Sequence, residues 1–289
     1  MSRLERLLAA ADGLLDRLER ITPPPATAPD WEDAIAFRWR GVNHANPLQA
    51  IRRPQTLRLA DLHCIERQKE ELARNTRQFL HGFGANNALL WGSRGTGKSS
   101  LIKALLHEYS ADGLRVVEVD KALLIDLPEL IDALEGREEK FILYSDDLSF
   151  EADDPSYKAL KAALDGPLCA LPDNVLLYAT SNRRHLLPEF NQENLQTRHL
   201  EGEIHHSESV EEKISLSERF GLWLSFHPFT QDQYILVVRY WLEQMGAEPE
   251  QWETIREEAL RWALKRGSRS GRVAWQFARD WNGRCQLGG

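Results

Sequence analysis

The feature that most restricts how this chain can fold is a glycine-rich stretch that leads directly into a lysine and two serines. Residues 89–106 read LLWGSRGTGKSSLIKALL: a short apolar run, a loop with three glycines, and then a pattern with helical spacing. Glycines let successive backbone N–H groups turn toward one point, and the helix that follows adds its positive end. The segment 92–99 therefore matches G-x-x-x-x-G-K-[ST], the phosphate-binding loop, between a predicted strand and a predicted helix.

This loop predicts a nucleotide site. We expect Lys98 to reach the β- and γ-phosphates and the Ser99 hydroxyl to bind Mg²⁺. A glycine-rich turn that binds nothing is the plain structural alternative. The residues expected to surround the nucleotide are Gly92, Ser93, Arg94, Gly95, Thr96, Gly97, Lys98, Ser99 and Ser100.

The rest of the chain predicts an α/β fold. Short apolar runs separated by stretches of helical character indicate a parallel five-stranded sheet flanked by helices. After Pro228 the strand pattern stops, and three helical segments follow at 232–245, 250–265 and 270–281, in which five of the nine tryptophans provide large rings for a small helical core. The expected strands are Ala88–Trp91, Leu114–Val119, Phe141–Ser145, Val175–Thr180 and Leu222–Phe226.

Three regions follow from these patterns. Residues 1–30 combine an amphipathic helix with the proline-rich linker TPPPATAP, which cannot continue a helix. Residues 31–229 form the expected nucleotide-binding domain, in which 31–58 has an irregular pattern and 61–81 reads as a helix that Asp61 could cap. Residues 230–289 form the expected all-α lid domain.

Composition limits the cellular setting and the partners. The net charge of −8 argues against a protein that binds polyanions over its whole surface. The three cysteines are scattered and in no paired motif, which is typical of free thiols in a reducing compartment. The first twenty residues carry charges throughout, so no secretory signal or membrane span is expected, and we predict a cytoplasmic protein.

A second acidic motif complements the loop. The segment FILYSDDLSFE is an apolar strand that ends in two aspartates. Asp146 is the expected metal-side carboxylate, and Asp147 is the candidate to polarise the attacking water. Paired aspartates at a strand end are otherwise common as caps or polar loop groups, and the adjacent run EADD reads as a solvated loop.

With both motifs placed, the chain resembles an AAA+ ATPase. The segment NVLLYATSNRRHL resembles the sensor-1 strand, in which Asn182 is the best match and Ser181 the next. SLSERFGLWLSF resembles the arginine-finger region with Arg219, and GSRSGRVAWQFARD resembles sensor 2 with Arg272, although Arg266 and Arg269 are rivals. DLHCIERQKEEL occupies the position of the adenine-flanking turn, with His-Cys where such turns often carry glycine.

More narrowly, these segments resemble the DUF815 group, a bacterial family of predicted AAA+ ATPases, over about residues 32–285. The resemblance implies an ATPase that uses ATP and Mg²⁺, forms nucleotide-dependent homo-oligomers and acts on a protein or nucleic-acid client. Its catalytic residues would be Lys98, Asp146, Asp147, Asn182, Arg219 and Arg272, with Ser99 and Asp146 at the metal. AAA+ machines usually carry Asp-Glu where this chain has Asp-Asp, which should slow hydrolysis.

Several alternatives stay open. A nucleotide-gated adaptor or loader with negligible hydrolysis fits the paired aspartates, which also occur in helicase loaders. A small-molecule kinase would normally need an acceptor-binding lid, and no N-K-x-D segment supports a GTPase. The arginines around 266–272 and at 52–53 could touch nucleic acid, which the overall acidity disfavours. His205 and His206 could hold a metal but more often lie in solvent, and the polar insert 189–215 is a candidate partner surface.

Overall fold

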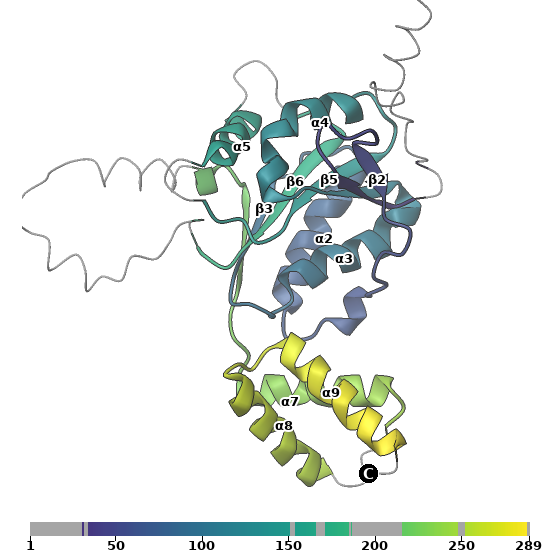
Figure 1. Cartoon of the computed structure of the whole chain (residues 1–289), viewed down its shortest axis with the longest axis vertical. Helices are drawn as coiled ribbons and strands as arrows, with labels where there is room; N and C mark the ends of the chain where they lie inside the picture. The colour runs from purple at the N-terminus through teal and green to yellow at the C-terminus, as the bar shows by residue number, and fades with distance from the viewer. Residues whose placement is uncertain are drawn as a thin grey trace, which may run out of the picture.

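The computed structural model describes residues 31, 34–150, 154–165, 171–184, 186, 216–247 and 252–287. In Figure 1 these residues form a sheet with helices on both faces and, below it in this view, a bundle made of α7, α8 and α9. The expected helix and linker of residues 1–30, the insert 189–215 and the pair His205–His206 lie outside the described residues. Within the described residues, no helix is long and apolar enough to cross a membrane.

The five predicted strands are present and run parallel. They are β3 (Ala88–Gly92), β4 (Leu114–Glu118), β5 (Lys140–Ser145), β6 (Val175–Ser181) and β7 (Leu222–Phe226). In the sheet they lie in the order β4-β5-β6-β3-β7, so β3 sits between two strands that come much later in the chain. Such a reversal of strand order opens a crevice at the carboxyl ends of the strands, where ligands bind.

The sheet has seven strands, so the prediction of five was wrong. The segment that we expected to be irregular supplies β1 (Ala36–Trp39), parallel to β4, and β2 (Leu48–Ala50), antiparallel to β1. These strands have 4 and 3 residues, too few for a periodic pattern to stand out. Their pairing depends on β4, which lies more than sixty residues further along the chain.

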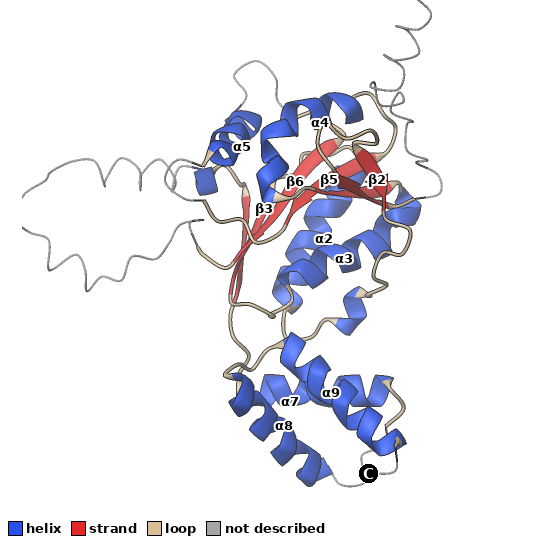
Figure 2. Cartoon of the chain, in the orientation of Figure 1, coloured by secondary structure: helices blue, strands red, loops and turns tan. Residues whose placement is uncertain are grey.

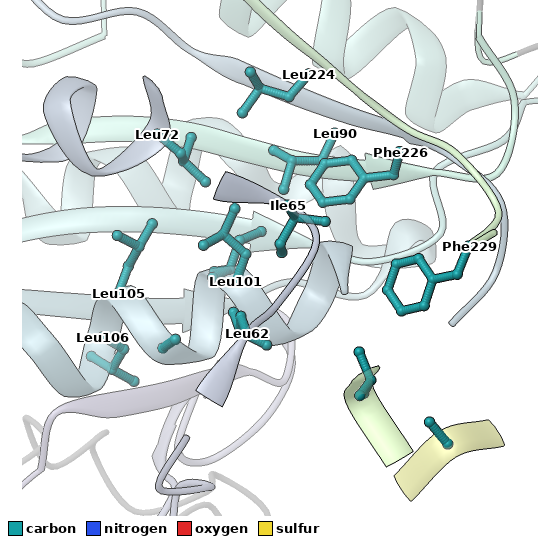
Figure 3. Close-up of a cluster of buried hydrophobic side chains, with 14 of the residues drawn as sticks. Leu62, Ile65, Leu72, Leu90, Leu101, Leu105, Leu106, Leu224, Phe226 and Phe229 are labelled. Carbon is teal, nitrogen blue, oxygen red and sulfur yellow. The ribbon is translucent and has the colours of Figure 1, made fainter. Parts of the chain in front are cut away.

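Helices cover the sheet on both faces (Figure 2). On one face lie α2 (Glu66–Leu80) and α3 (Lys98–Tyr109), and on the other α4 (Leu127–Leu134) and α5 (Pro155–Asp165). Short 3₁₀ turns connect them at Leu59–Asp61, Ser110–Asp112 and Lys121–Asp126. In Figure 3, leucines of α2 and α3 pack against Leu90 and Leu224 of the sheet, and alternate strand residues such as Leu89 belong to the core of the opposite face.

The C-terminal bundle follows the prediction closely. It comprises α7 (Gln231–Gln244), α8 (Trp252–Arg266) and α9 (Gly271–Gln286), and the predicted boundary near residue 229 falls in the connection between β7 and α7. A capping box of Thr230 and Gln233 begins α7. The tryptophan prediction holds in part: four of the five rings are partly buried at the edge of the core, whereas Trp275 is exposed.

Asp61 does not cap α2, which corrects that expectation, because α2 begins only at Glu66 and Asp61 ends the preceding 3₁₀ turn Leu59–Asp61. Its carboxylate instead accepts hydrogen bonds from the Tyr240 hydroxyl of the lid (2.6 Å), from the backbone N–H of Arg58 (2.8 Å) and from the Arg58 guanidinium (3.0 Å). Burial acts to raise the pKa of Asp61, but these hydrogen bonds outweigh it and lower the pKa below its ordinary value. Asp61 therefore connects the sheet domain to α7 of the lid through the hydrogen bond from Tyr240.

Tyr240→Phe should lower the free energy of unfolding by about 1–2 kcal/mol at pH 7, because it removes a hydrogen bond to a buried carboxylate. The pKa of Asp61 is lowered in the folded protein, so this contribution is present above about pH 4 and is lost as the pH falls through the folded pKa. Urea denaturation of parent and variant at pH 7 and at low pH measures both effects. In an Asp61→Asn background, Tyr240→Phe should lower the free energy of unfolding much less. An equal loss in that background would contradict the hydrogen bond between Tyr240 and Asp61 as the cause.

Candidate functional site

The backbone of the loop between β3 and α3 takes a conformation that requires glycine. Gly97, the residue that caps α3, has φ = +107°, in the left-handed region. A Cβ atom at Gly92 would lie 2.0 Å from the carbonyl oxygen of Phe226 on the neighbouring strand β7, so no larger residue fits there. The loop therefore lies close against β7, and α3 begins directly after Gly97.

Lys98 folds back over its own loop. Its Nζ donates hydrogen bonds to the carbonyl oxygens of Gly92 (2.7 Å) and Ser93 (2.8 Å) and to Oδ1 of Asn182 (3.1 Å). Burial is the main cause that lowers the pKa of Lys98 to about 8, and the charges of Asp146 and Asp147 oppose it. The positive charges of Arg272 and Arg94 make smaller contributions that lower this pKa further.

Asp146 follows β5 and meets the first turn of α3. The hydroxyl groups of Ser99 (2.8 Å) and Thr180 (2.5 Å) both donate to its Oδ1. Burial acts to raise the pKa of Asp146, but the hydroxyl groups of Thr180, Tyr144 and Ser99 outweigh it and lower the pKa, so the carboxylate stays charged. A carboxylate beside a serine hydroxyl is the hard-oxygen pair that Mg²⁺ prefers, so the predicted metal residues fit this ion.

Asp147 lies next to this pair and has a constrained backbone. Its φ is +53°, which aspartate tolerates better than most residues, and its N–H donates to the Thr180 hydroxyl at 2.9 Å. The carboxylate accepts a short hydrogen bond from the side-chain amide of Asn182 and lies 3.7 Å from the Arg94 guanidinium. Asn182 thus connects Lys98 with Asp147, whereas Ser181, the second sensor-1 candidate, is buried and donates to the carbonyl of Leu148.

The lid contacts the loop through the start of α9. The N–H of Arg272 donates to the carbonyl of Gly95 at 3.3 Å, and a Cβ at Gly95 would lie 2.8 Å from the Ser270 hydroxyl. The Arg272 side chain is exposed in the first turn of α9. Of its rivals, Arg266 stacks on Trp262 at 5.2 Å, and Arg269 lines a cleft beside the loop.

Arg219 is the predicted site residue that the fold keeps apart from the others. It precedes β7, whose Leu222 pairs with Ala88 at the amino end of β3, while Phe226 pairs with Gly92 at the loop. At about 3.3 Å for each strand residue, Arg219 lies some 15 Å or more from the loop of its own chain. It lies near the amino ends of β3 and β7, whereas the loop lies at their carboxyl ends.

A cleft of about 760 Å³ opens between the loop and the lid, within the size range of small-molecule sites. Ser93, Arg94 and Thr96 line it from the loop, and Phe229 and Leu264 are among its apolar walls. Thr96 is itself buried and donates to the carbonyl of Ser93 at 2.7 Å, while Ser100 lies in the first turn of α3.

The proposed adenine-flanking turn lies on another side of the loop. The Ile65 side chain would come 3.2 Å from a Cβ at Gly97, and the His63 ring packs at 4.1 Å against Tyr240 of the lid. Cys64, which follows His63, has φ = +64°, so the position where such turns often carry glycine keeps a left-handed backbone here.

Sequence reasoning missed Thr180, which contacts both aspartates. Its position two residues before Asn182 at the end of a strand was the available signal, because alternate strand residues share one face.

Within the described part of the chain, no group of three or more histidine, cysteine, aspartate or glutamate side chains is arranged to hold a metal.

Comparisons with known proteins identify the family and the fold. Residues 32–285 match the family described as "Protein of unknown function (DUF815)". The Aeropyrum pernix Orc1 protein, solved in complex with DNA, is 16% identical with a TM-score of 0.52, over 78% of this chain and 61% of that one. The Thermotoga maritima RuvB Holliday junction branch migration motor is 13% identical with a TM-score of 0.42, over 74% of this chain and 68% of that one. No curated protein has a matching sequence. The fold is that of the AAA+ P-loop ATPases.

Lys98 should lose its proton near pH 8 in the nucleotide-free protein, instead of near its ordinary value of 10.5. Between these values the unfolded chain holds a proton that folded Lys98 has lost, so this group makes stability rise with pH across that window. An NMR titration of ¹³C-labelled lysine side chains measures the pKa. Asp146→Asn should lower it further, since the carboxylate favours the charged lysine; a Lys98 pKa near 10 in the parent would contradict the burial described above.

Proposed function

Because this chain belongs to the DUF815 family and has the AAA+ fold, we propose that it binds ATP with Mg²⁺ and hydrolyses it. The cycle would remodel or load a protein or nucleic-acid client in the cytoplasm. The observation that carries the proposal is the meeting of three strand ends at the phosphate loop. Lys98, Asp146 and Asn182 follow β3, β5 and β6 in the chain, and hydrogen bonds link them through Ser99, Thr180 and Asp147.

The loop and Lys98 provide the phosphate site. Phosphate oxygens are better acceptors for an ammonium than the carbonyls of Gly92 and Ser93, so Lys98 exchanges those partners on binding. Ser99 and Asp146 would hold Mg²⁺, which when bound neutralises charge on the transferred phosphoryl group. Arg272, whose helix start touches Gly95, would report the state of the phosphates to the lid.

Asp147 is the group that would orient and polarise the attacking water. Its carboxylate is exposed at the mouth of the site, and Asn182 fixes it by a hydrogen bond. Arg219 lies too far from the loop to serve its own chain. A neighbouring copy in a homo-oligomer would therefore supply it as the arginine finger that stabilises transition-state charge.

A second function, a nucleotide-gated loader or adaptor with negligible hydrolysis, has one observation in its favour. Asp147 stands where AAA+ machines usually carry the longer glutamate, and both Asn182 and Arg94 already engage its carboxylate. A shorter carboxylate reaches less far toward the attacking water, and one that already accepts a hydrogen bond and pairs with an arginine is less able to take its proton. In this case nucleotide occupancy alone would order the assembly, and oligomer size would differ between ATP and ADP without turnover.

Lys98→Ala should abolish ATP binding, because it removes the only loop side chain expected to pair directly with the β- and γ-phosphates. Isothermal titration calorimetry in magnesium buffer should show at least about a hundredfold loss of affinity. Lys140→Ala is the matched control, since this lysine donates to the Asp173 carbonyl at the amino end of β5, away from the loop. Equal affinities of parent and Lys98→Ala would overturn the nucleotide site.

Arg219→Ala should leave ATP binding intact and reduce turnover by about a thousandfold, the usual scale for an arginine finger. Steady-state phosphate release at increasing protein concentration, beside calorimetry, separates the two effects. Arg261→Ala, which removes an exposed arginine paired with Glu257 in the lid, serves as control. A variant as fast as the parent would refute the finger, whereas a parent without measurable turnover would support the loader.

A further inference from the structure

The Tyr144 hydroxyl is a buried polar group that the proposed mechanism does not yet use. Tyr144 lies on β5 and is 5% exposed. Within the described residues, its hydroxyl makes no hydrogen bond that meets normal geometry. Buried hydroxyls are nearly always paired, because an unpaired one loses its hydration without compensation. An unpaired group in this position calls for a partner in another state of the protein.

The surroundings of this hydroxyl identify that state. Tyr144 precedes Asp146 by two residues, so both side chains leave the strand end on the same face, toward α3. The hydroxyl lies beside Asp146, Ser99 and Thr180, which are already joined to one another. Oδ1 of Asp146 accepts from both Ser99 and Thr180, so the carboxylate has no room for a third donor on that oxygen.

We propose that Tyr144 is a positioning residue for the magnesium-loaded site, acting through Asp146. The proposal rests on the function proposed above. Ser99 and Asp146 would hold the ion, with Ser99 using an oxygen lone pair and keeping its O–H on the carboxylate. The Tyr144 hydroxyl lies beside this carboxylate without a well-formed hydrogen bond, and in the loaded site it would donate to Asp146 and hold its orientation. Because that hydrogen bond would be complete only in the loaded site, the hydroxyl would favour the loaded state over the empty one.

If Tyr144 only filled the core, the expected result would be the opposite. Its ring packs with Leu101, Ile102 and Leu105 of α3 in one cluster, and phenylalanine preserves that packing. In a purely structural role, removal of the hydroxyl would change neither nucleotide affinity nor its dependence on Mg²⁺.

The test is Tyr144→Phe, with thermal unfolding of the nucleotide-free protein and ATP affinity measured with and without Mg²⁺. The melting temperature should stay the same or rise, because an unpaired buried hydroxyl is removed. ATP affinity in saturating Mg²⁺ should fall about fivefold or more, the scale of one hydrogen bond, and more Mg²⁺ should be needed for half-maximal binding. Affinity without Mg²⁺ should not change.

Tyr178→Phe is the matched control on the neighbouring strand. That hydroxyl is fully buried but paired with Asn75 (3.0 Å) and Thr76 (2.9 Å), so its removal should lower stability and leave the Mg²⁺ dependence unchanged. In an Asp146→Asn background, Tyr144→Phe should have no further effect on the Mg²⁺ dependence. If the parent binds MgATP and Tyr144→Phe binds it equally well, the positioning role is wrong while the proposed function stands. If the parent binds no ATP, both fail.

Discussion

One buried cation sets the arrangement of the candidate site. The Lys98 ammonium is 6% exposed, and a charge in that position is stable only when surrounding oxygens replace its lost water. Two carbonyls of its own loop and Asn182 provide those oxygens, and two carboxylates lie close enough to favour its charged form. These groups come from three segments of the chain that are at least 35 residues apart. They meet because β3, β5 and β6 are parallel and end at the same edge of the sheet.

The loop that carries this cation is also the contact between the two parts of the chain. Gly92 lies against the backbone of β7 at a distance that excludes a side chain, and Gly95 lies against the Ser270 side chain at the start of α9. Asp61 adds a second connection from the sheet domain to α7 through Tyr240. Lid and sheet residues also share one hydrophobic cluster, to which Figure 3 shows Phe226 and Phe229 contributing. A change in the loop backbone would therefore also displace the lid, which gives the proposed function a physical route from the loop to the lid.

The sequence predicted well those elements whose pattern is local. The apolar runs that became β3 to β7 have 5 to 7 residues each, and α7 and α9 begin at side-chain caps. The sequence-based prediction failed for elements and side chains whose partners lie far along the chain. The strands β1 and β2 have too few residues to show the alternating pattern of a strand. They form because β1 pairs with β4 and β2 pairs with β1. Asp61 resembled a helix cap, but its hydroxyl partner is 179 residues away.

For the site, the sequence alone determined the chemistry: the loop motif, the paired aspartates and the polar strand end after β6 are readable as residue types at fixed spacings. The tertiary structure decided which of these groups share the site. It brought Thr180 and Tyr144 to the carboxylate of Asp146, turned Ser181 into the core and left Asn182 facing Lys98. It also placed Arg219 before the amino end of β7, away from the loop at the carboxyl end. The reason is that spacing along a chain fixes only neighbours in sequence, whereas strand order and pleat fix which side chains converge across the sheet.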